Sequence, residues 1–339
     1  MRRVAIVGFA SEVALTPDGR NEAELVGPVV DRALAAAKVS AAEVEVVGSA
    51  GSEFLNGVVG TVMGAFDGLP GWPPRTHFHL EADGAFALYE SWVRLLAGEG
   101  EVALVCAFSR PSAADPISVL GLQLDPYLVA PLAPSPRSVA ALQARALIDS
   151  GRYGEADLAG VVHARRGEVQ PSALVGQPYV ASPLRAADCS TVCSGAAAVV
   201  LAVDDRASAA SPHPAWITGI EQRIETAGLG RRELSTSPSV QAAASRLGLP
   251  GSVIDVLEVH APFSHQELIV LDAIGAGDVR SLNPSGGALP ADPIMATGLI
   301  RIGAAAQAIL NGQARRTVGH ATNGPCLQHN LLCLTERDR

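Results

Sequence analysis

The sequence has little positive charge and no run of basic residues. Its 25 lysine and arginine residues stand against 34 aspartate and glutamate residues, which gives a formal net charge of −9. A surface that follows the phosphates of DNA or RNA is normally basic, so a nucleic-acid partner is not expected. Charged residues of all kinds make up only 17% of the chain, whereas hydrophobic residues make up 48%. This composition excludes wholesale disorder and provides material for a large buried core.

Long hydrophobic runs are also missing. The first apolar run, Val4–Ala10, is followed by Ser11 and Glu12 and has no convincing cleavage site after it. It is too short to cross a bilayer, which takes about 20 residues. We therefore interpret it as a buried strand rather than a signal peptide, and we expect no membrane association.

Cysteines are few, odd in number and not arranged in C-x-x-C pairs. Such a pattern argues against a disulfide framework and against a zinc site, and it suits a reducing cytoplasm. We predict that the protein holds no metal and that its cysteines pack in the interior. The five are Cys106, Cys189, Cys193, Cys326 and Cys333.

Strand-like and helix-like segments alternate in the first third of the chain. This alternation is typical of a mostly parallel sheet covered by helices. The segments are residues 3–9 (strand), 21–37 (helix), 44–48 (strand), 82–97 (helix) and 102–108 (strand).

The same order returns in the last third and predicts two similar βαβαβ halves. Direct identity between the halves is faint, so the repeat is inferred from the pattern. The later segments are residues 216–219 (strand), 237–247 (helix), 253–259 (strand), 264–274 (helix) and 295–310 (helix), with strands around 318 and 331.

The segment from about 110 to 185 interrupts this order. It is rich in proline, serine and glycine and has one clear helix at 138–150, so we interpret it as a loop insertion over the core. The apolar run at 195–202 returns to a strand pattern. We therefore divide the chain into a first half, an insertion and a second half, with bounds 1–114 (completed by 186–210), 115–185 and 211–339.

Four stretches together resemble the thiolase superfamily, in particular its sterol-carrier-protein and lipid-transfer branch. Residues 282–298 read LNPSGGALPADPIMATG, where the family has N-P-x-G-G, a spacer and G-H-P-x-G-A-T-G. Residues 258–268 read EVHAPFSHQEL, similar to the family stretch H-E-A-F or H-D-C-F. Residues 325–330 read PCLQHN, close to L-Q-H-N, and residues 80–88 read LEADGAFAL, where the family has C-x-x-G-x-x-A-L. The resemblance implies the thiolase fold, with five layers in the order α-β-α-β-α.

The family's reactive residues are largely replaced. Its nucleophilic cysteine, at the start of the central buried helix, corresponds to Glu81, and Asp83 two residues on is interpreted as a helix cap. The histidine of G-H-P corresponds to Asp292, which exchanges a hydrogen-bond donor for an acceptor. The second family cysteine falls near Asn323 and Gly324 and is lost as well, whereas His260, at the head of the H-x-x-F stretch, is retained.

A thiolase-like site without a nucleophile implies chemistry without an acyl-enzyme. Some relatives in this branch are steroid side-chain aldolases, which need an enolate-stabilising group and a base. By this resemblance His260 polarises the thioester carbonyl of a β-hydroxyacyl-CoA and Asp292 takes the hydroxyl proton, with Glu81 as the rival base. These aldolases have tyrosine where His260 stands. Coenzyme A enters only as part of the substrate, and no separate cofactor is expected.

Further candidates for substrate binding come from the same stretches. A glycine gives close backbone approach, and amide or imidazole groups supply hydrogen bonds. Several of these residues have a structural interpretation too, as loop or core residues. The candidates are Asn283, Gly287, His320, Asn323 and Gly324.

The main alternative is a catalytically silent subunit that scaffolds an active partner. The resemblance implies a homodimer or a heterodimer with another thiolase-like chain, and a possible small partner with an OB fold and a zinc ribbon. A lipid or acyl-CoA carrier is the least supported alternative. An enzyme predicts that His260, Asp292 and Glu81 meet at one open pocket, whereas a silent subunit predicts a plugged one.

Overall fold

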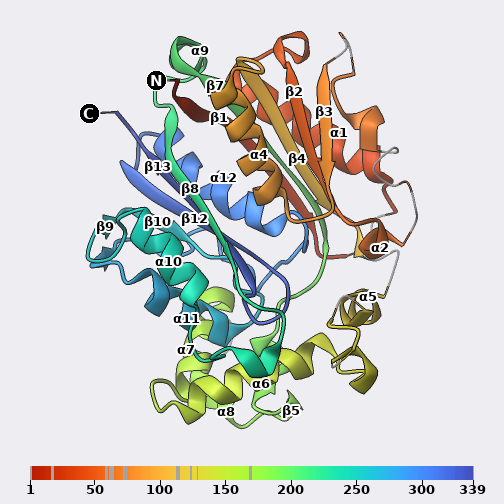
Figure 1. Cartoon of the computed structure of the whole chain (residues 1–339), viewed down its shortest axis with the longest axis vertical. Coiled ribbons are helices and arrows are strands. Elements are labelled where there is room, and N and C mark those ends of the chain that lie inside the picture. The colour runs from red at the N-terminus through yellow and green to blue at the C-terminus, as the bar shows by residue number, and fades with distance from the viewer. Residues whose placement is uncertain are drawn as a thin grey trace.

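The fold is built on one nine-stranded mixed sheet (Figure 1). The computed structural model describes residues 2–16, 19–57, 60, 65–71, 73, 75–111, 115–122, 124–127, 129–167 and 170–338. The strands lie in the order β10 (Val256–Glu258), β12 (Arg316–Asn323), β13 (His329–Glu336), β8 (Ala215–Ile224), β1 (Val4–Ala14), β7 (Ser194–Val203), β4 (Val102–Ser109), β2 (Val46–Ala50) and β3 (Thr76–Leu80).

Two half-sheets meet at a short junction between β1 and β8. Ala5 pairs there with Trp216 and Ile6 with Ala215, whereas β1 pairs with β7 along nearly its whole length. Among the described strands of the nine-stranded sheet, only the pairs β2–β3, β2–β4 and β10–β12 are parallel. The prediction of a mostly parallel sheet is therefore wrong. β13 follows its antiparallel neighbour β12 through a short loop, whereas β7 returns antiparallel beside β4 only after residues 110–193.

Two helices lie between the half-sheets, α4 (Gly84–Ala97) and α12 (Thr297–Leu310). Leu88 of α4 and Leu299 of α12 belong to one buried cluster with Val105 of β4 and Leu331 of β13. The outer face of the first half-sheet is covered by α1 (Glu22–Ala37). That of the second is covered by α10 (Pro238–Arg246) and α11 (Ser264–Ile274). The predicted five layers, α-β-α-β-α, are confirmed.

Burial on both faces explains the composition of the central strands. Every residue of β4 and of β7 is buried, and both strands are almost wholly apolar. A strand with one solvent face would alternate apolar and polar residues instead. Helices α4, α11 and α12 likewise match the predicted segments to within two residues at each end.

The strand predicted at 253–259 is divided in two. Asp255 interrupts it because its carboxylate accepts hydrogen bonds from the backbone N–H groups of Arg315 and Arg316. The result is β9 (Val253–Ile254), which pairs with β11 (Asp278–Val279), and β10, which pairs with β12.

The middle segment is helical rather than a loop, which corrects the prediction for 115–185. It contains α5 (Pro116–Leu122), α6 (Pro136–Asp149), α7 (Glu155–Arg166) and α8 (Pro171–Val175), followed by β5 (Tyr179–Ala181) and β6 (Leu184–Arg185). The prolines misled the sequence analysis. Pro116, Pro136 and Pro171 each begin a helix, where a missing N–H costs nothing.

Short elements complete the described structure. Over the part of the chain covered by the structure, no helix is both long and apolar enough to span a bilayer. The remaining elements are α2 (Glu53–Asn56), α9 (Asp204–Ala210) and the 3-10 turns Ala41–Glu43, Phe66–Gly68, Ala130–Leu132, Ala186–Asp188 and Leu229–Arg231.

Candidate active site

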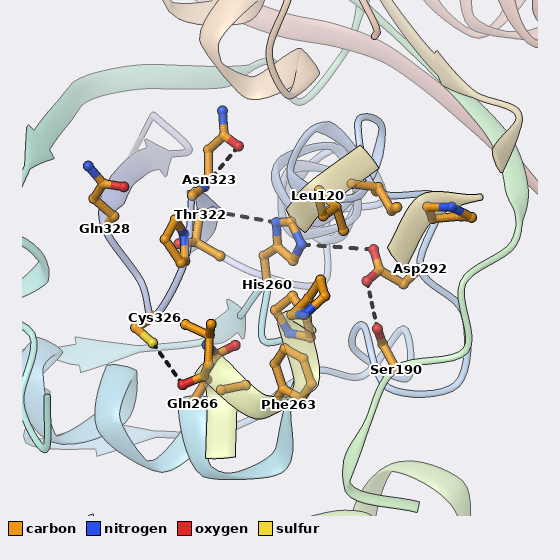
Figure 2. Close-up of a pocket in the computed structure, with 18 of the residues that line it drawn as sticks. Leu120, Ser190, His260, Phe263, Gln266, Asp292, Thr322, Asn323, Cys326 and Gln328 are labelled. Atoms are coloured by element: carbon orange, nitrogen blue, oxygen red, sulfur yellow. Dashed lines mark hydrogen bonds and ion pairs between the residues drawn. The ribbon is translucent and has the colours of Figure 1, made fainter. Parts of the chain in front are cut away.

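A pocket of about 420 Å³ lies where the two central helices begin (Figure 2). Asp83, the N-cap of α4, and Met295, just before α12, line its floor. Leu120 of α5 and Val139 of α6 line an apolar wall, so the middle segment covers the site. The loop that joins β12 to β13 lines the pocket too, and its Cys326 packs against Val139. The pocket thus combines polar groups from the core with an apolar wall from the middle segment.

His260 follows β10 directly and lies buried in this pocket. Its Nδ1 accepts a hydrogen bond from the backbone N–H of Thr322, at 3.4 Å. In the neutral ring the proton is therefore on Nε2, which lies 4.0 Å from Oδ1 of Asp292 (Figure 2). Burial lowers the pKa of His260 well below its ordinary value, and His320 and Arg301 add to this shift. His260 thus presents a neutral N–H donor to the pocket.

Asp292 is a buried carboxyl held by two hydroxyl groups. Ser190 Oγ donates to Oδ2 and Thr297 Oγ1 donates to Oδ1, each at 2.7 Å. Burial raises the pKa of Asp292, while the two hydroxyls and Arg301 act in the opposite direction. A carboxylate can accept about four hydrogen bonds, so both oxygens retain acceptor capacity toward the pocket. Asp292 can therefore take a proton from a group placed beside His260.

A buried ion pair lies beneath these two residues. Arg301 of α12 donates to Glu258 at 3.1 Å and to Ser285 at 2.6 Å. Its positive charge favours the neutral form of His260 and the ionised form of Asp292. Arg301 therefore favours His260 as a neutral hydrogen-bond donor and Asp292 as a base.

Asp83, predicted from the sequence only as a helix cap, also lines the pocket. Its Oδ1 accepts from the N–H of Ala85 in α4 at 2.8 Å, and its Oδ2 accepts from the N–H of Gly298 in α12 at 2.7 Å. A Cβ at Gly298 would lie 2.4 Å from Oδ1, so glycine is required for this approach. Burial, with a smaller contribution from the charge of nearby Asp292, raises the pKa of Asp83 to about 7. In the sequence, Gly298 lies near the start of a predicted helix. Its contact with Asp83 depends on the fold and could not be predicted from that position alone.

Glu81 does not meet His260 and Asp292, which corrects the predicted three-residue site. Its side chain is 44% exposed and is not among the residues that line the pocket. Its carboxylate accepts from the backbone N–H of Glu53, at the start of α2, at 3.1 Å. Glu81 precedes the first turn of α4, so its side chain turns toward α2 instead of the pocket floor.

Three predicted substrate-binding residues lie away from the pocket as well. Asn283 is buried, accepts from the N–H of Val259 and donates to Glu267, so it joins two core segments. Gly287 packs against Asn283 with φ of +74°, a turn conformation that glycine readily adopts. His320 bonds Asn330 at 3.0 Å within the sheet. Each therefore supports the structure around the site instead of facing it.

Asn323 and Gly324 do line the pocket, as does Arg137. Asn323 Oδ1 accepts from the N–H of Gly324 at 2.9 Å, which leaves the amide N–H₂ group for other partners. Arg137, in the first turn of α6, is exposed and is the one arginine among the described lining residues, which include no lysine. Arg137 would therefore attract an anionic ligand, whereas the carboxyls at the pocket floor would repel it.

The cysteines near the pocket do not supply a nucleophile. Burial raises the pKa of the Cys189, Cys193 and Cys326 thiols to about 11 in each case. The reactive form of cysteine is the thiolate, which is scarce near neutral pH at such values. Within the described ranges, no group of three or more His, Cys, Asp or Glu side chains is placed to hold a metal ion. The buried groups from which we argue the chemistry are therefore the neutral imidazole of His260 and the carboxyls of Asp83 and Asp292.

Comparison of sequences gives a partial match. No family model matches the chain. The acetyl-CoA acetyltransferase of Methanothermobacter thermautotrophicus is 31% identical over 186 residues, with 47% of this chain and 47% of that protein covered. The match thus spans about half the length of this curated relative.

Comparison of structures extends over the whole chain. The Ltp2–ChsH2(DUF35) aldolase has a TM-score of 0.77 at 17% identity, over 99% of this chain and 98% of that chain. Human mitochondrial 3-ketoacyl-CoA thiolase in complex with CoA has a TM-score of 0.78 at 17% identity, over 100% and 98%. At such identities the likeness shows the fold alone. The predicted thiolase fold is confirmed.

Proposed function

We propose that this thiolase-fold chain is a carbon–carbon lyase that cleaves a β-hydroxyacyl-CoA by a retro-aldol reaction, without a covalent acyl-enzyme. The observation that supports it is the pairing of a neutral imidazole N–H with a carboxylate, 4.0 Å apart in one pocket. Glu81, in the place of the family's nucleophile, turns away from that pocket. The pocket is open, with polar groups at its floor, which favours an enzyme over a silent scaffolding subunit.

The chemistry follows from the two groups. Asp292 takes the proton of the β-hydroxyl group, the Cβ–O bond becomes a carbonyl, and the Cα–Cβ bond breaks. The electron pair moves into the thioester as an enolate, whose oxygen accepts a hydrogen bond from His260 Nε2–H. Preorganised donors in a water-poor site stabilise such an oxyanion strongly. The hydroxyl groups of Ser190 and Thr297 hold Asp292 in place during the transfer.

The substrate, partners and location complete the proposal. The apolar wall formed by α5 and α6 suits a bulky acyl group, and we propose a steroid side chain. The name of the Ltp2–ChsH2(DUF35) aldolase pairs two components. By analogy we propose a thiolase-like partner chain in a homodimer or heterodimer, and a small OB-fold, zinc-ribbon partner. We further propose that the protein works in the cytoplasm.

The test is a cleavage assay with a β-hydroxyacyl-CoA that carries a steroid ring. The purified chain is used alone and with any small protein that co-purifies with it. Release of a ketone or aldehyde in equal amounts with the shortened acyl-CoA supports the lyase. Absence of turnover in both formats, together with a stable complex with a cysteine-bearing thiolase homologue, would instead support the silent subunit.

Arg137→Ala is expected to raise KM for the acyl-CoA about fivefold and to leave kcat unchanged, because an exposed charge contact contributes up to about 1 kcal/mol. Arg137 is exposed at the pocket, whereas His260 and Asp292 are buried. Steady-state kinetics with the acyl-CoA measures the change, and Arg137→Lys should keep most of the affinity.

A substrate without phosphates provides the control for Arg137. The same acyl group carried on pantetheine lacks the nucleotide phosphates, so its KM should be equal in the wild type and in Arg137→Ala. An equal rise of KM for both thioesters would show that Arg137 shapes the pocket instead of attracting phosphate.

A further inference from the structure

The second carboxyl of the pocket, Asp83, has no part in the steps described above. It lies on the pocket floor between the N-terminal ends of α4 and α12 and is 2% exposed. Its two oxygens are fixed by N–H groups of Ala85 and Gly298, one from each helix. The charge of Asp292 raises the pKa of Asp83, so the two carboxyls interact electrostatically. The floor therefore holds two carboxyls in fixed positions.

We propose that Asp83 is a second catalytic acid–base residue, which delivers a proton to the α-carbon of the enolate after the carbon–carbon bond has broken. This inference rests on the proposed lyase function and assigns a separate step of it. Retro-aldol cleavage moves one proton from the β-hydroxyl oxygen to the α-carbon. With two carboxyls in one pocket, one can take the hydroxyl proton and the other can deliver a proton to the α-carbon.

The step balances in atoms and charge. Asp292 begins as a carboxylate and ends as a carboxylic acid after it takes the hydroxyl proton. Asp83 begins as a carboxylic acid, gives its proton to the α-carbon as the enolate electrons form the new C–H bond, and ends as a carboxylate. The products are a ketone or aldehyde and the shortened acyl-CoA. Release of one proton by Asp292 and uptake of one by Asp83 from solvent restore the enzyme.

The other groups of the pocket fit the step less well. His260 holds the enolate oxygen through its single N–H, and its pKa is lowered well below the ordinary value, so it has no second proton to give. The thiols of Cys189 and Cys326 are weak acids, since burial raises their pKa to about 11. Burial raises the pKa of Asp83 to about 7, so a substantial fraction carries a proton near neutral pH. Backbone N–H groups of Ala85, Gly298 and Leu299 bond the carboxyl, which can accept about four hydrogen bonds in all.

The experiment follows exchange of the α-protons of propanoyl-CoA with D₂O, measured by mass spectrometry. This reaction is the α-carbon step run alone: a base removes the proton, His260 stabilises the enolate, and solvent deuterium returns. Asp83→Ser should lower the exchange rate about 10²-fold, the typical contribution of a general acid or base. Asp255→Asn, the same kind of change outside the pocket, should leave exchange as in the wild type.

Serine is chosen because it is a good N-cap and can still accept from an N–H of α4, so α4 keeps its start. Asp83→Asn serves as a second variant of nearly the same size, and thermal melts show whether each variant folds. Exchange that is equally fast in wild type and in both folded Asp83 variants overturns the inference while leaving the lyase intact. Exchange lost as fully in Asp255→Asn as in Asp83→Ser overturns it too. A wild type that neither cleaves nor exchanges refutes the proposed function itself.

Discussion

Asp292→Asn is expected to lower kcat for cleavage of the β-hydroxyacyl-CoA by about 10²–10⁴-fold, the range for loss of a general base. Asparagine keeps the size of the side chain and removes its ability to take a proton. The hydroxyl groups of Ser190 and Thr297 can rotate to accept from an amide N–H₂ group as well as donate to its oxygen. The fold should therefore survive, and the loss should be in kcat instead of in soluble protein.

The pH profile gives a second measure of the same residue. Asp292 works as a base only when ionised, and burial raises its pKa. The rate should therefore fall as pH decreases through a value above the ordinary range of aspartate, and this acid limb should disappear in Asp292→Asn. His260 should add no limb near pH 6, because its pKa is lowered well below the ordinary value and the ring stays neutral.

Asp255→Asn is the matched control for Asp292→Asn. Asp255 accepts from two backbone N–H groups at the other end of β10 from His260. The same change there should cost some stability and leave kcat and the pH profile as in wild type. Equal loss of kcat in both variants, or full activity in Asp292→Asn, would contradict the assignment of Asp292 as the base.

The five layers were predicted from the resemblance to the thiolase superfamily, whereas individual helices were predicted from local apolar patterns. Helix 264–274 was predicted with its correct bounds, since its apolar residues recur at helical spacing and Gly275 ends it. Strand direction was not predictable from such patterns. Whether β7 runs parallel or antiparallel to β4 depends on how the chain returns from the middle segment, which no local pattern contains. The prolines of that segment were ambiguous, because the same residue can interrupt a helix or begin one.

The candidate site was predictable where a sequence motif fixes both the residue and the way its side chain faces. His260 follows a strand end and Asp292 lies in a constrained loop, and the structure brings them to one pocket. Glu81 and Asp83 are only two residues apart; Glu81 was predicted to face the pocket, and the structure places Asp83 there. Which of the two carboxyls faces the pocket depends on two segments distant in the sequence. The start of α2 binds Glu81, and the start of α12 binds Asp83. A position that matches a family's reactive residue in alignment thus need not point the same way once its chemistry changes.

His260→Ala is expected to lower kcat for cleavage about 10²–10³-fold, the cost of removing one donor to a developing oxyanion. The imidazole is aimed by a single backbone contact, from the N–H of Thr322, which fixes the proton on Nε2. Because His260 acts when charge develops on the thioester oxygen, KM should change much less than kcat. Exchange of the α-protons of propanoyl-CoA should be lost in the same proportion, since it forms the same enolate.

His260→Gln separates the donor from the shape of the ring. Glutamine can place an amide N–H near the position of Nε2, so part of the activity lost in His260→Ala should return. Burial keeps the imidazole neutral, and therefore a neutral amide is a chemically reasonable substitute. The measurement is kcat for cleavage and the rate of α-proton exchange in wild type and both variants, with melting curves to confirm folding. Unchanged kcat in a folded His260→Ala variant would show that another group holds the enolate oxygen. The pairing of His260 with Asp292 would then no longer support the lyase function.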